Sequence, residues 1–222
     1  MTVLLVVVTF VVFIAIDMVL NRKKAPLLAP SLESAGQTAG MLEEILSGFR
    51  VPAFLRYHPG HTWLMRERKN VERVGADEFA AILAGPVDRI ELPKPGHWIR
   101  QGQKAISLFR GEEKIEMVSP VEGEVVEVNA EIAAHPELLR EDPYGKGWLM
   151  TVFSPDEEGP ARNLLPANLL GSWMKEASEA FYRLQPQLAG ATAADGGRPS
   201  KDATAAMPPE AWKRAAHELL LS

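Results

Sequence analysis

Three carboxylates and one amine lie close together in the middle of the chain. Glu112, Glu113 and Glu116 fall within five positions, and Lys114 stands between them. Carboxylates grouped in this way could do general acid–base chemistry if burial or a neighbouring charge shifted their pKa values. They directly follow Gly111, however, and a glycine followed by charged side chains is typical of a solvated polar turn. We therefore expect a surface turn here and no tuned acid pair.

The five histidines are the other candidates for chemistry. His58 and His61 have a spacing that could suit a metal ion, but the chain has no cysteine and no further histidine cluster to complete a ligand set. The other three are isolated: His97, His135 and His217. The sequence also lacks a phosphate-binding glycine loop and a serine-nucleophile elbow. We expect no catalytic residue and no metal site, and predict that the chain is not an enzyme.

Composition narrows the function classes further. A length of 222 residues suits one folded domain with accessory segments. The net charge of -5, with interspersed charged residues, leaves no basic surface for nucleic acid. The absence of cysteine excludes disulfides, thiolate chemistry and iron–sulfur ligation.

The N-terminus predicts a membrane anchor over residues 2–21. Residues 3–16 are apolar apart from Thr9, and a helix over 2–20 would be about 28 Å long, close to the thickness of the bilayer core. A cleaved signal peptide would need a positive leading region and a small-residue cleavage site, which are missing. Arg22, Lys23 and Lys24 follow directly, and positive flanks stay in the cytoplasm. We expect a single-pass protein of the cell membrane with its globular domain on the cytoplasmic side.

Residues 22–52 are predicted to be a linker that ends in a short helix. Prolines and small polar residues dominate up to Gly40. Residues 41–46 then form an amphipathic pattern, and Ser47 with Gly48 is a plausible helix stop. The apolar face of this helix could dock on another subunit or pack on its own domain.

The central region, within a domain predicted over 53–184, has the pattern of β structure. Short apolar runs are separated by glycine, proline and asparagine turns, at 88–92, 104–109, 115–118, 124–128 and 149–153. In the fourth run we expect Val126 and Val128 on one face of a half-buried strand, with Glu127 on the other. Residues 77–83 are the one helix expected among these strands, with Asp77 and Glu78 in its first turn.

The C-terminal third changes to a helical period. Apolar residues recur from Leu169 to Leu184 with a spacing near 3.6, which predicts a helix packed on the domain. Residues 185–207 are poor in large apolar side chains and are predicted to be a flexible linker. Residues 208–222, which include Trp212, are predicted to form a last short helix. That helix could dock on a partner or on its own chain.

Several motifs occur in an order that matches one known family. They begin with Tyr57, His61 and Trp63 and end with a run over 119–129 that starts Ser-Pro-Val. Between these ends stand Gly75, Phe79, Ala80, Glu91, Leu92, Pro93, Gly96 and Gly102. The chain therefore resembles the glycine cleavage system H protein over about residues 57–153. The resemblance implies a mainly β, barrel-sandwich hybrid fold of the lipoyl type with flanking helices, here with one added transmembrane helix.

The resemblance also assigns the cofactor position. In this family a lysine that carries lipoate stands ten residues after the glycine matched by Gly102 and seven before the serine matched by Ser119. Both counts lead to Glu112, whose carboxylate cannot form the lipoyl amide. We therefore expect no lipoyl group and no other cofactor. The alternative is that Lys114, two positions further on, carries lipoate in a shifted register.

Three functions remain open from the sequence. The first is a membrane-anchored, non-lipoylated, non-catalytic scaffold, whose partners would be membrane lipid and other subunits of a membrane-associated complex. The second is a lipoyl carrier modified at Lys114, acting with aminomethyltransferase or with enzymes like dihydrolipoamide dehydrogenase. The third is a regulatory decoy that binds lipoyl-processing enzymes. None of the three involves nucleic acid.

Overall fold

The structure is a computed structural model that describes residues 43–156, 159, 162–184 and 198–221. All of these residues belong to one compact unit, Gly36–Ser222. The anchor that we predict over 2–21 and most of the predicted linker lie outside the described residues. Within the part of the chain that the structure describes, no helix is long and apolar enough to cross a membrane.

Eleven strands are described: β1 (Glu43–Leu46), β2 (Phe49–Pro52), β3 (Arg56–Tyr57), β4 (Thr62–Arg68), β5 (Val71–Ala76), β6 (Arg89–Glu91), β7 (Trp98–Ile99), β8 (Lys104–Arg110), β9 (Glu113–Val118), β10 (Gly123–Val128) and β11 (Met150–Phe153). The α-helices are α3 (Glu78–Ala84), α4 (Ala130–Ala134), α5 (Leu138–Glu141), α6 (Leu170–Leu184) and α8 (Pro209–Leu219), and the 3₁₀ turn η2 (Ala167–Leu169) leads into α6.

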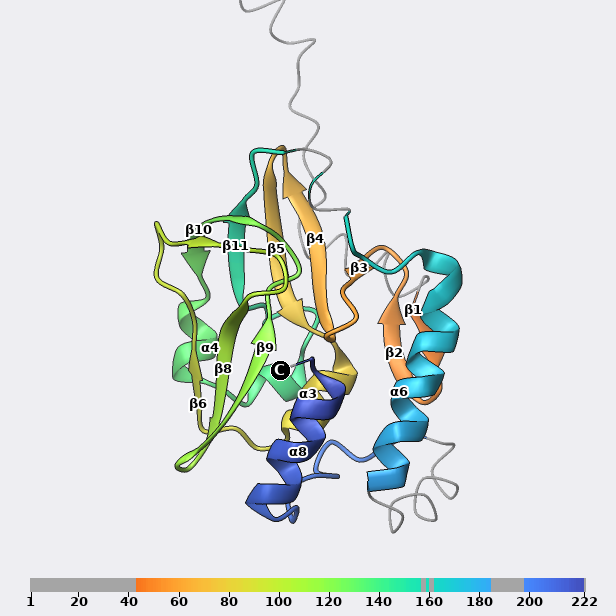
Figure 1. The fold of residues 1–222 in the computed structure, drawn as a ribbon. Coiled ribbons are helices and arrows are strands. Elements are labelled where there is room, and N and C mark those ends of the chain that lie inside the picture. Colours follow the sequence, from red (N-terminus) through yellow and green to blue (C-terminus); the bar gives the residue numbers. More distant parts are fainter. Residues whose placement is uncertain (1–42, 157–158, 160–161, 185–197, 222) are drawn as a thin grey trace, which may run out of the picture. The chain divides into compact units, whose positions relative to one another are not determined.

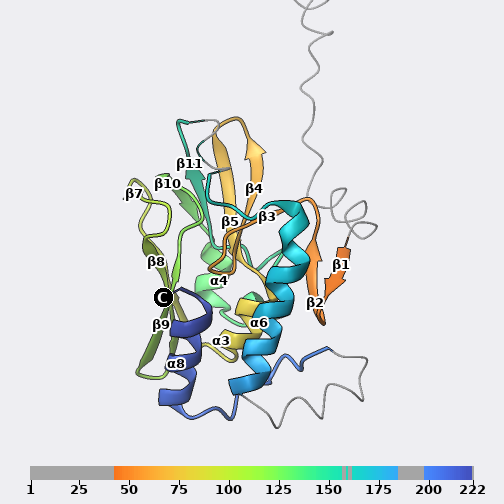
Figure 2. The same ribbon diagram turned by 45° about the vertical axis from the view of Figure 1, so that its right-hand side comes forward.

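The strands form three antiparallel sheets (Figure 1). A six-stranded sheet has the order β3-β4-β5-β11-β10-β7, a three-stranded sheet has the order β6-β8-β9, and β1 and β2 form a two-stranded sheet. Helices α3, α6 and α8 flank these sheets in both ribbon views (Figures 1 and 2). The predicted mainly β fold with flanking helices is therefore confirmed.

Alternation along the strands builds the core. In the hairpin of β8 and β9, Ile106, Leu108, Ile115 and Met117 are all at most 4% exposed, and their sequence neighbours lie on the outer face. Gly75 in β5 allows the close approach of the sheet to a large ring, because a Cβ at this position would overlap the indole of Trp63.

Helix α3 confirms the helix predicted over 77–83. Its N-cap is Asp77, whose Oδ1 accepts a hydrogen bond from the Ala80 amide at 2.8 Å. It ends at Gly85, which has a positive φ of 67°. All seven helical residues are buried, so α3 is part of the core. Two further short helices, α4 and α5, lie between β10 and β11, where we predict none.

The helix predicted over 41–46 is wrong. Residues 43–52 instead form a hairpin in which Leu46 pairs with Phe49. Ser47 and Gly48 both have positive φ values, 52° and 91°, so they form the turn of this hairpin and not the stop of a helix. Phe49 and Val51 are at most 1% exposed and anchor the hairpin in the core, which the pattern of residues 41–46 alone could not show.

The predicted facing of β10 is also wrong in part. Val125 is fully buried, whereas Val126 is 43% exposed and Val128 is half-buried. The pairing of β10 with β11 shifts register between Val125 and Glu127, which leaves Val126 as the extra residue of a β-bulge. The bulge breaks the simple alternation from which we assign the buried face.

Helix α6 follows the predicted helical stripe. Met174, Ala177 and Phe181 are buried, spaced three and four residues apart, and Phe181 contacts the ring of Phe79 at 6.0 Å between centroids. At the start of the predicted stripe, Leu169 is 46% exposed and belongs to the 3₁₀ turn. The helix lies beside the β1–β2 hairpin in both ribbon views (Figures 1 and 2).

Candidate functional site

The hairpin of β8 and β9 carries the residues that the sequence singles out. The strands pair from Lys104 and Val118 up to Arg110 and Glu113, so Gly111 and Glu112 alone form the turn. Gly111 has a φ of 59°, and its amide donates to Asp88 Oδ2 at 2.5 Å. Glu112 is exposed at the end of the hairpin. The polar turn that we predict is therefore present, and Glu112 is the one acidic residue in it.

The other charged residues of this segment lie on the two faces of β9. Lys114 is opposite Phe109 on the outer face, and its Nζ bonds Glu116 Oε1 at 2.9 Å. Glu113 is opposite Arg110 on the inner face. Its carboxylate accepts from Lys213 Nζ at 2.8 Å, an ion pair that raises the pKa of Lys213. Alternation therefore separates the three carboxylates, and they form no acid–base pair.

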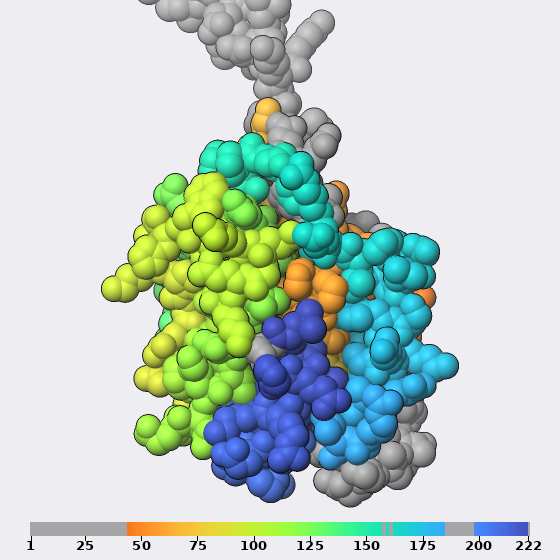
Figure 3. Space-filling model, viewed as in Figure 1, coloured from red at the N-terminus to blue at the C-terminus, as the bar shows by residue number. Residues whose placement is uncertain are grey.

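The inner face of the hairpin is covered by the C-terminal helix. Figure 3 shows α8 lying directly against the hairpin surface. Trp212 is fully buried and its indole Nε1 donates to Leu83 O at 3.0 Å. The Arg110 guanidinium lies 4.4 Å from the centre of the Trp212 ring and donates to Ala84 O at 2.6 Å. Of the two docking surfaces considered for this helix, the structure shows the one on its own chain.

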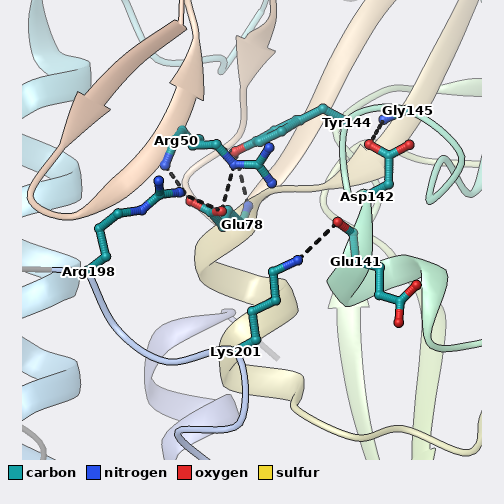
Figure 4. Close-up of polar contacts among 8 residues, drawn as sticks. All are labelled: Arg50, Glu78, Glu141, Asp142, Tyr144, Gly145, Arg198 and Lys201. Atoms are coloured by element: carbon teal, nitrogen blue, oxygen red, sulfur yellow. Dashed lines mark hydrogen bonds and ion pairs between the residues drawn. The ribbon is translucent and has the colours of Figure 1, made fainter. Parts of the chain in front are cut away.

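Residues 198–207, which we predict as the end of a flexible linker, contact the domain at several points. Thr204 is fully buried; its hydroxyl donates to Ile82 O at 3.0 Å, and its carbonyl accepts from Arg110 Nη1 at 3.0 Å. Arg140 bonds Asp202. Lys201 reaches the carbonyl of Glu141 at 3.2 Å (Figure 4). We call residues 198–207 the strap, because they fasten α8 to the domain.

A buried carboxylate joins the strap to the β1–β2 hairpin. Glu78, with its side chain 6% exposed, accepts from the Arg50 amide at 2.5 Å and from Arg50 Nε at 2.7 Å. Arg198 approaches the same carboxylate at 3.5 Å, as Figure 4 shows. Tyr144 completes the group, since its hydroxyl donates to Arg50 O at 2.5 Å and accepts from the Glu78 amide at 3.0 Å. These polar groups hold together β2, the start of α3, the strap and the loop that carries Tyr144.

The ionisation of Tyr144 fits a structural role. Burial, followed by the nearby Tyr57 and acidic groups, raises its pKa well above the ordinary value. The phenol therefore stays protonated at physiological pH and remains a hydrogen-bond donor. A proton-transfer role would require a pKa shifted toward neutrality, which is the opposite direction.

His58 and His61, whose spacing could suit a metal ion, instead make hydrogen bonds within the domain. His61 is 2% exposed, its Nδ1 is 2.8 Å from Asp77 Oδ2, and its ring is stacked between Phe79 and Trp173 at 4.2 and 4.4 Å. His58 Nδ1 accepts from the Gly60 amide at 3.0 Å. The remaining three histidines are exposed and lie in separate segments: His97 before β7, His135 after α4 and His217 in α8. Among the residues that the structure describes, no group of three His, Asp or Glu side chains could hold a metal ion.

Comparison with known proteins identifies the family. A family model described as glycine cleavage H-protein matches residues 55–177, which is more than half of the chain. The chain belongs to the glycine cleavage H-protein family. It is 36% identical over 132 residues to the glycine cleavage system H protein of Symbiobacterium thermophilum, covering 57% of the chain and 97% of that protein. It is 35% identical over 117 residues to that of Aeromonas salmonicida, covering 53% and 90%. A solved H protein from Mycobacterium marinum aligns with a TM-score of 0.49 and 24% identity, covering 57% and 98%.

The family match separates an H-protein core from additions. It covers every strand from β3 to β11 and the first half of α6. The β1–β2 hairpin, the strap and α8 lie outside the match, yet they contribute Phe49, Val51, Thr204 and Trp212 to the interior. In this H-protein family member, additions from both ends of the match therefore pack on the core.

Two features of the site are missed by the sequence reasoning. The first is the contact of Arg110 with Trp212, and the second is the buried Glu78 group. The spacing of Trp212, Ala215 and Ala216 indicates that α8 has an apolar face, but it does not say which surface that face covers. Glu78 resembles an ordinary first-turn acid in the sequence, and only the folded chain brings Arg50 to it.

Proposed function

We propose that the chain is a membrane-anchored member of the H-protein family that has lost the lipoyl lysine and serves as a non-catalytic interaction or scaffold subunit. The observation that carries the proposal is the turn of the β8–β9 hairpin, which consists of Gly111 and Glu112 and offers no amine. Lipoate is attached through an amide to a lysine amine, so a carboxylate at this position does not fit the group.

The surroundings of Lys114 support the same proposal. Its side chain is 46% exposed, but it lies within β9 on the outer face and is bonded to Glu116. A carrier arm works as a tether that swings between partner sites, which favours attachment at a protruding turn. A lysine within a paired strand is a poorer position for such an arm.

The support for the membrane anchor and for the cytoplasmic location of the domain comes from the sequence. The apolar segment over 2–21 and the basic residues that follow it support a single span with the domain in the cytoplasm. We propose membrane lipid and other subunits of a membrane-associated complex as partners. Confinement near the membrane would raise the effective concentration of the domain beside such subunits.

The first experiment is the intact mass of the purified full chain, expressed in cells with active lipoylation. We expect the unmodified mass, because Glu112 has no nucleophilic nitrogen. Glu112→Lys restores an amine at the turn and should produce a chain that gains one lipoyl unit. A matched variant, Glu122→Lys, adds the same charge change at another exposed position and should stay unmodified.

One observation favours the alternative, a lipoyl carrier modified at Lys114, and the mass experiment would reveal it. The matched relatives are named glycine cleavage system H protein, and Lys114 has a half-exposed amine two residues from the turn. A lipoyl increment on the wild-type chain that disappears in Lys114→Arg would overturn the scaffold proposal. Restoration of glycine cleavage in cells that lack their own H protein would overturn it as well. Tight binding to lipoyl-processing enzymes without modification would instead indicate the decoy.

A further inference from the structure

A segment of the chain carries basic and aromatic residues without any acid. Residues 92–111 contain no Asp or Glu, although the chain has 29 of them, and they include Lys94, Arg100, Lys104 and Arg110. The stretch between β6 and β8 also holds the exposed side chains of His97 and Trp98. We call Lys94, His97, Trp98 and Arg100 the β7 patch.

The exposure of Trp98 is built into the sheet. Strand β7 is the edge strand of the six-stranded sheet, where Ile99 points inward at 2% exposed and Trp98 points outward at 50%. Trp98 is opposite Glu124 of β10, and Glu124 is opposite Phe153 of β11, which is 41% exposed. Two large rings therefore lie on one outer face of the sheet, on either side of a single carboxylate.

Backbone hydrogen bonds hold the loop that carries the patch. The Gly96 amide donates to Val125 O at 2.8 Å, and the Val125 amide donates to His97 O at 2.9 Å. Gly96 has a φ of 85°, which lets the loop turn sharply just before β7. The patch is thus fixed to β10, so folding keeps the indole at the surface.

Chemistry of this kind fits a bilayer surface. Tryptophan concentrates at the membrane–water interface, where its amphipathic ring lies at the level of the headgroups and its N–H reaches polar groups. Lysine and arginine beside it are attracted to anionic lipid headgroups of the cytoplasmic leaflet. We propose that the β7 patch is a contact site for an anionic lipid bilayer, which orients the domain on the membrane. This inference rests on the proposed anchor, which would keep the patch close to the lipid.

The cations of the patch itself suit an anionic surface, but the neighbouring acids limit the strength of the contact. Lys94 and Arg100 are its exposed cations, while the exposed Glu122 and Glu124 come from the β10 side, with Glu124 directly opposite Trp98. An acid-free loop with an exposed indole is complementary to a negative surface. Because the basic residues are few, we expect the contact to be weak by itself and the anchor to make it persistent.

The absence of native cysteine allows a direct test on the full chain. A single environment-sensitive fluorophore is attached at Pro95→Cys in the patch loop, or at Glu176→Cys on α6, which lies on another side of the domain (Figures 1 and 2). Each chain is reconstituted into phosphatidylcholine vesicles with or without phosphatidylglycerol, and quenching by doxyl-labelled lipid is measured. We expect quenching at position 95 that increases with phosphatidylglycerol, and none at position 176.

The matched charge variants decide the cause. K94E/R100E in the Pro95→Cys chain should reduce quenching to the level seen at position 176. K175E/R183E, the same charge change on α6, should leave it intact, and Trp98→Ala should weaken it in both vesicle types. Equal quenching at the two label positions, or none at either, overturns the inference. Cross-linking of position 95 to a membrane protein without lipid quenching overturns it in favour of a protein partner.

A separate readout reports on the anchor. Co-flotation with pure phosphatidylcholine vesicles that survives alkaline washing shows that the chain is inserted, whatever the patch does. If the chain floats and position 95 is not quenched, the anchor stands and the patch inference fails. If the chain binds only phosphatidylglycerol vesicles and position 95 is quenched, the patch inference stands and the anchor fails.

Discussion

The β1–β2 and β8–β9 hairpins both turn in two residues, but they place those turns in different surroundings. In the first, Ser47 and Gly48 both have positive φ, the pattern of a type I′ turn, and Ser47 O accepts from the Ser178 hydroxyl at 3.4 Å. In the second, only Gly111 has positive φ, the pattern of a type II′ turn, and a Cβ added there would meet no atom within 4 Å.

The difference shows how the same motif can serve packing or presentation. The first hairpin is held in the core by Phe49 and Val51, and α6 lies beside it. The second is held one residue below its turn, where Arg110 meets Trp212, while Glu112 stays exposed. A hairpin that is fixed beneath an open turn presents that turn in one position. Here the residue so presented is a carboxylate, Glu112.

The largest effect should come from removing the support under the second hairpin. Trp212→Ala deletes a fully buried indole, its hydrogen bond to Leu83 O and its contact with Arg110. We expect a loss of about 3–5 kcal/mol in the free energy of unfolding, measured by chemical denaturation. Arg214→Ala, an exposed position on the same helix, should change it by less than about 0.5 kcal/mol.

Hydrogen exchange on the same variants sharpens the comparison. In Trp212→Ala we expect amides near the β8–β9 turn to lose protection, while amides of the β1–β2 hairpin keep theirs, because that hairpin is held by the contact of Phe49 with Phe79 of α3 and by the bond from Ser178 of α6. Equal loss in both hairpins would mean that the C-terminal helix stabilises the domain as a whole.

A smaller effect should come from the turn itself. Gly111→Ala forces a side chain into the left-handed region without any steric contact, so only backbone strain opposes it, at a cost of about 1 kcal/mol. Gly171→Ala is the matched change in α6, also in open space, and should be neutral or stabilising by up to about 1 kcal/mol. If both variants were equally destabilised, strain at the turn would not be the cause.

The smallest effect should be a change in the pH dependence of stability. Burial, and then the nearby His61, lowers the pKa of His58 below 6.5, so the folded state binds this proton less readily than the unfolded state. Stability should therefore fall as the pH drops from about 6.5 through the folded-state pKa. His58→Gln should flatten this part of the stability profile. His217→Gln, at an exposed position on α8, should leave it unchanged.

Local patterns predicted much of the fold but not all of its pairing. The helix over 77–83 was found because Asp77 caps it, and the runs at 104–109 and 115–118 were found because their inner residues alternate. The hairpin over 43–52 was missed because Ser47 and Gly48 can end a helix or turn a hairpin, and the choice depends on Phe49 and Val51 finding the core. The bulge at Val126 was missed because it depends on pairing with β11.

The sequence by itself determined the H-protein family and the residues at the turn of the β8–β9 hairpin. Both follow from residue identity and spacing, which need no contacts across space. Tertiary structure alone decided that Glu113 pairs with Lys213 of α8, that Trp212 covers Arg110, and that Trp98 stays at the surface. These depend on which elements meet, because an apolar helix face or an exposed ring shows its partner only after the long-range contacts of the chain have formed.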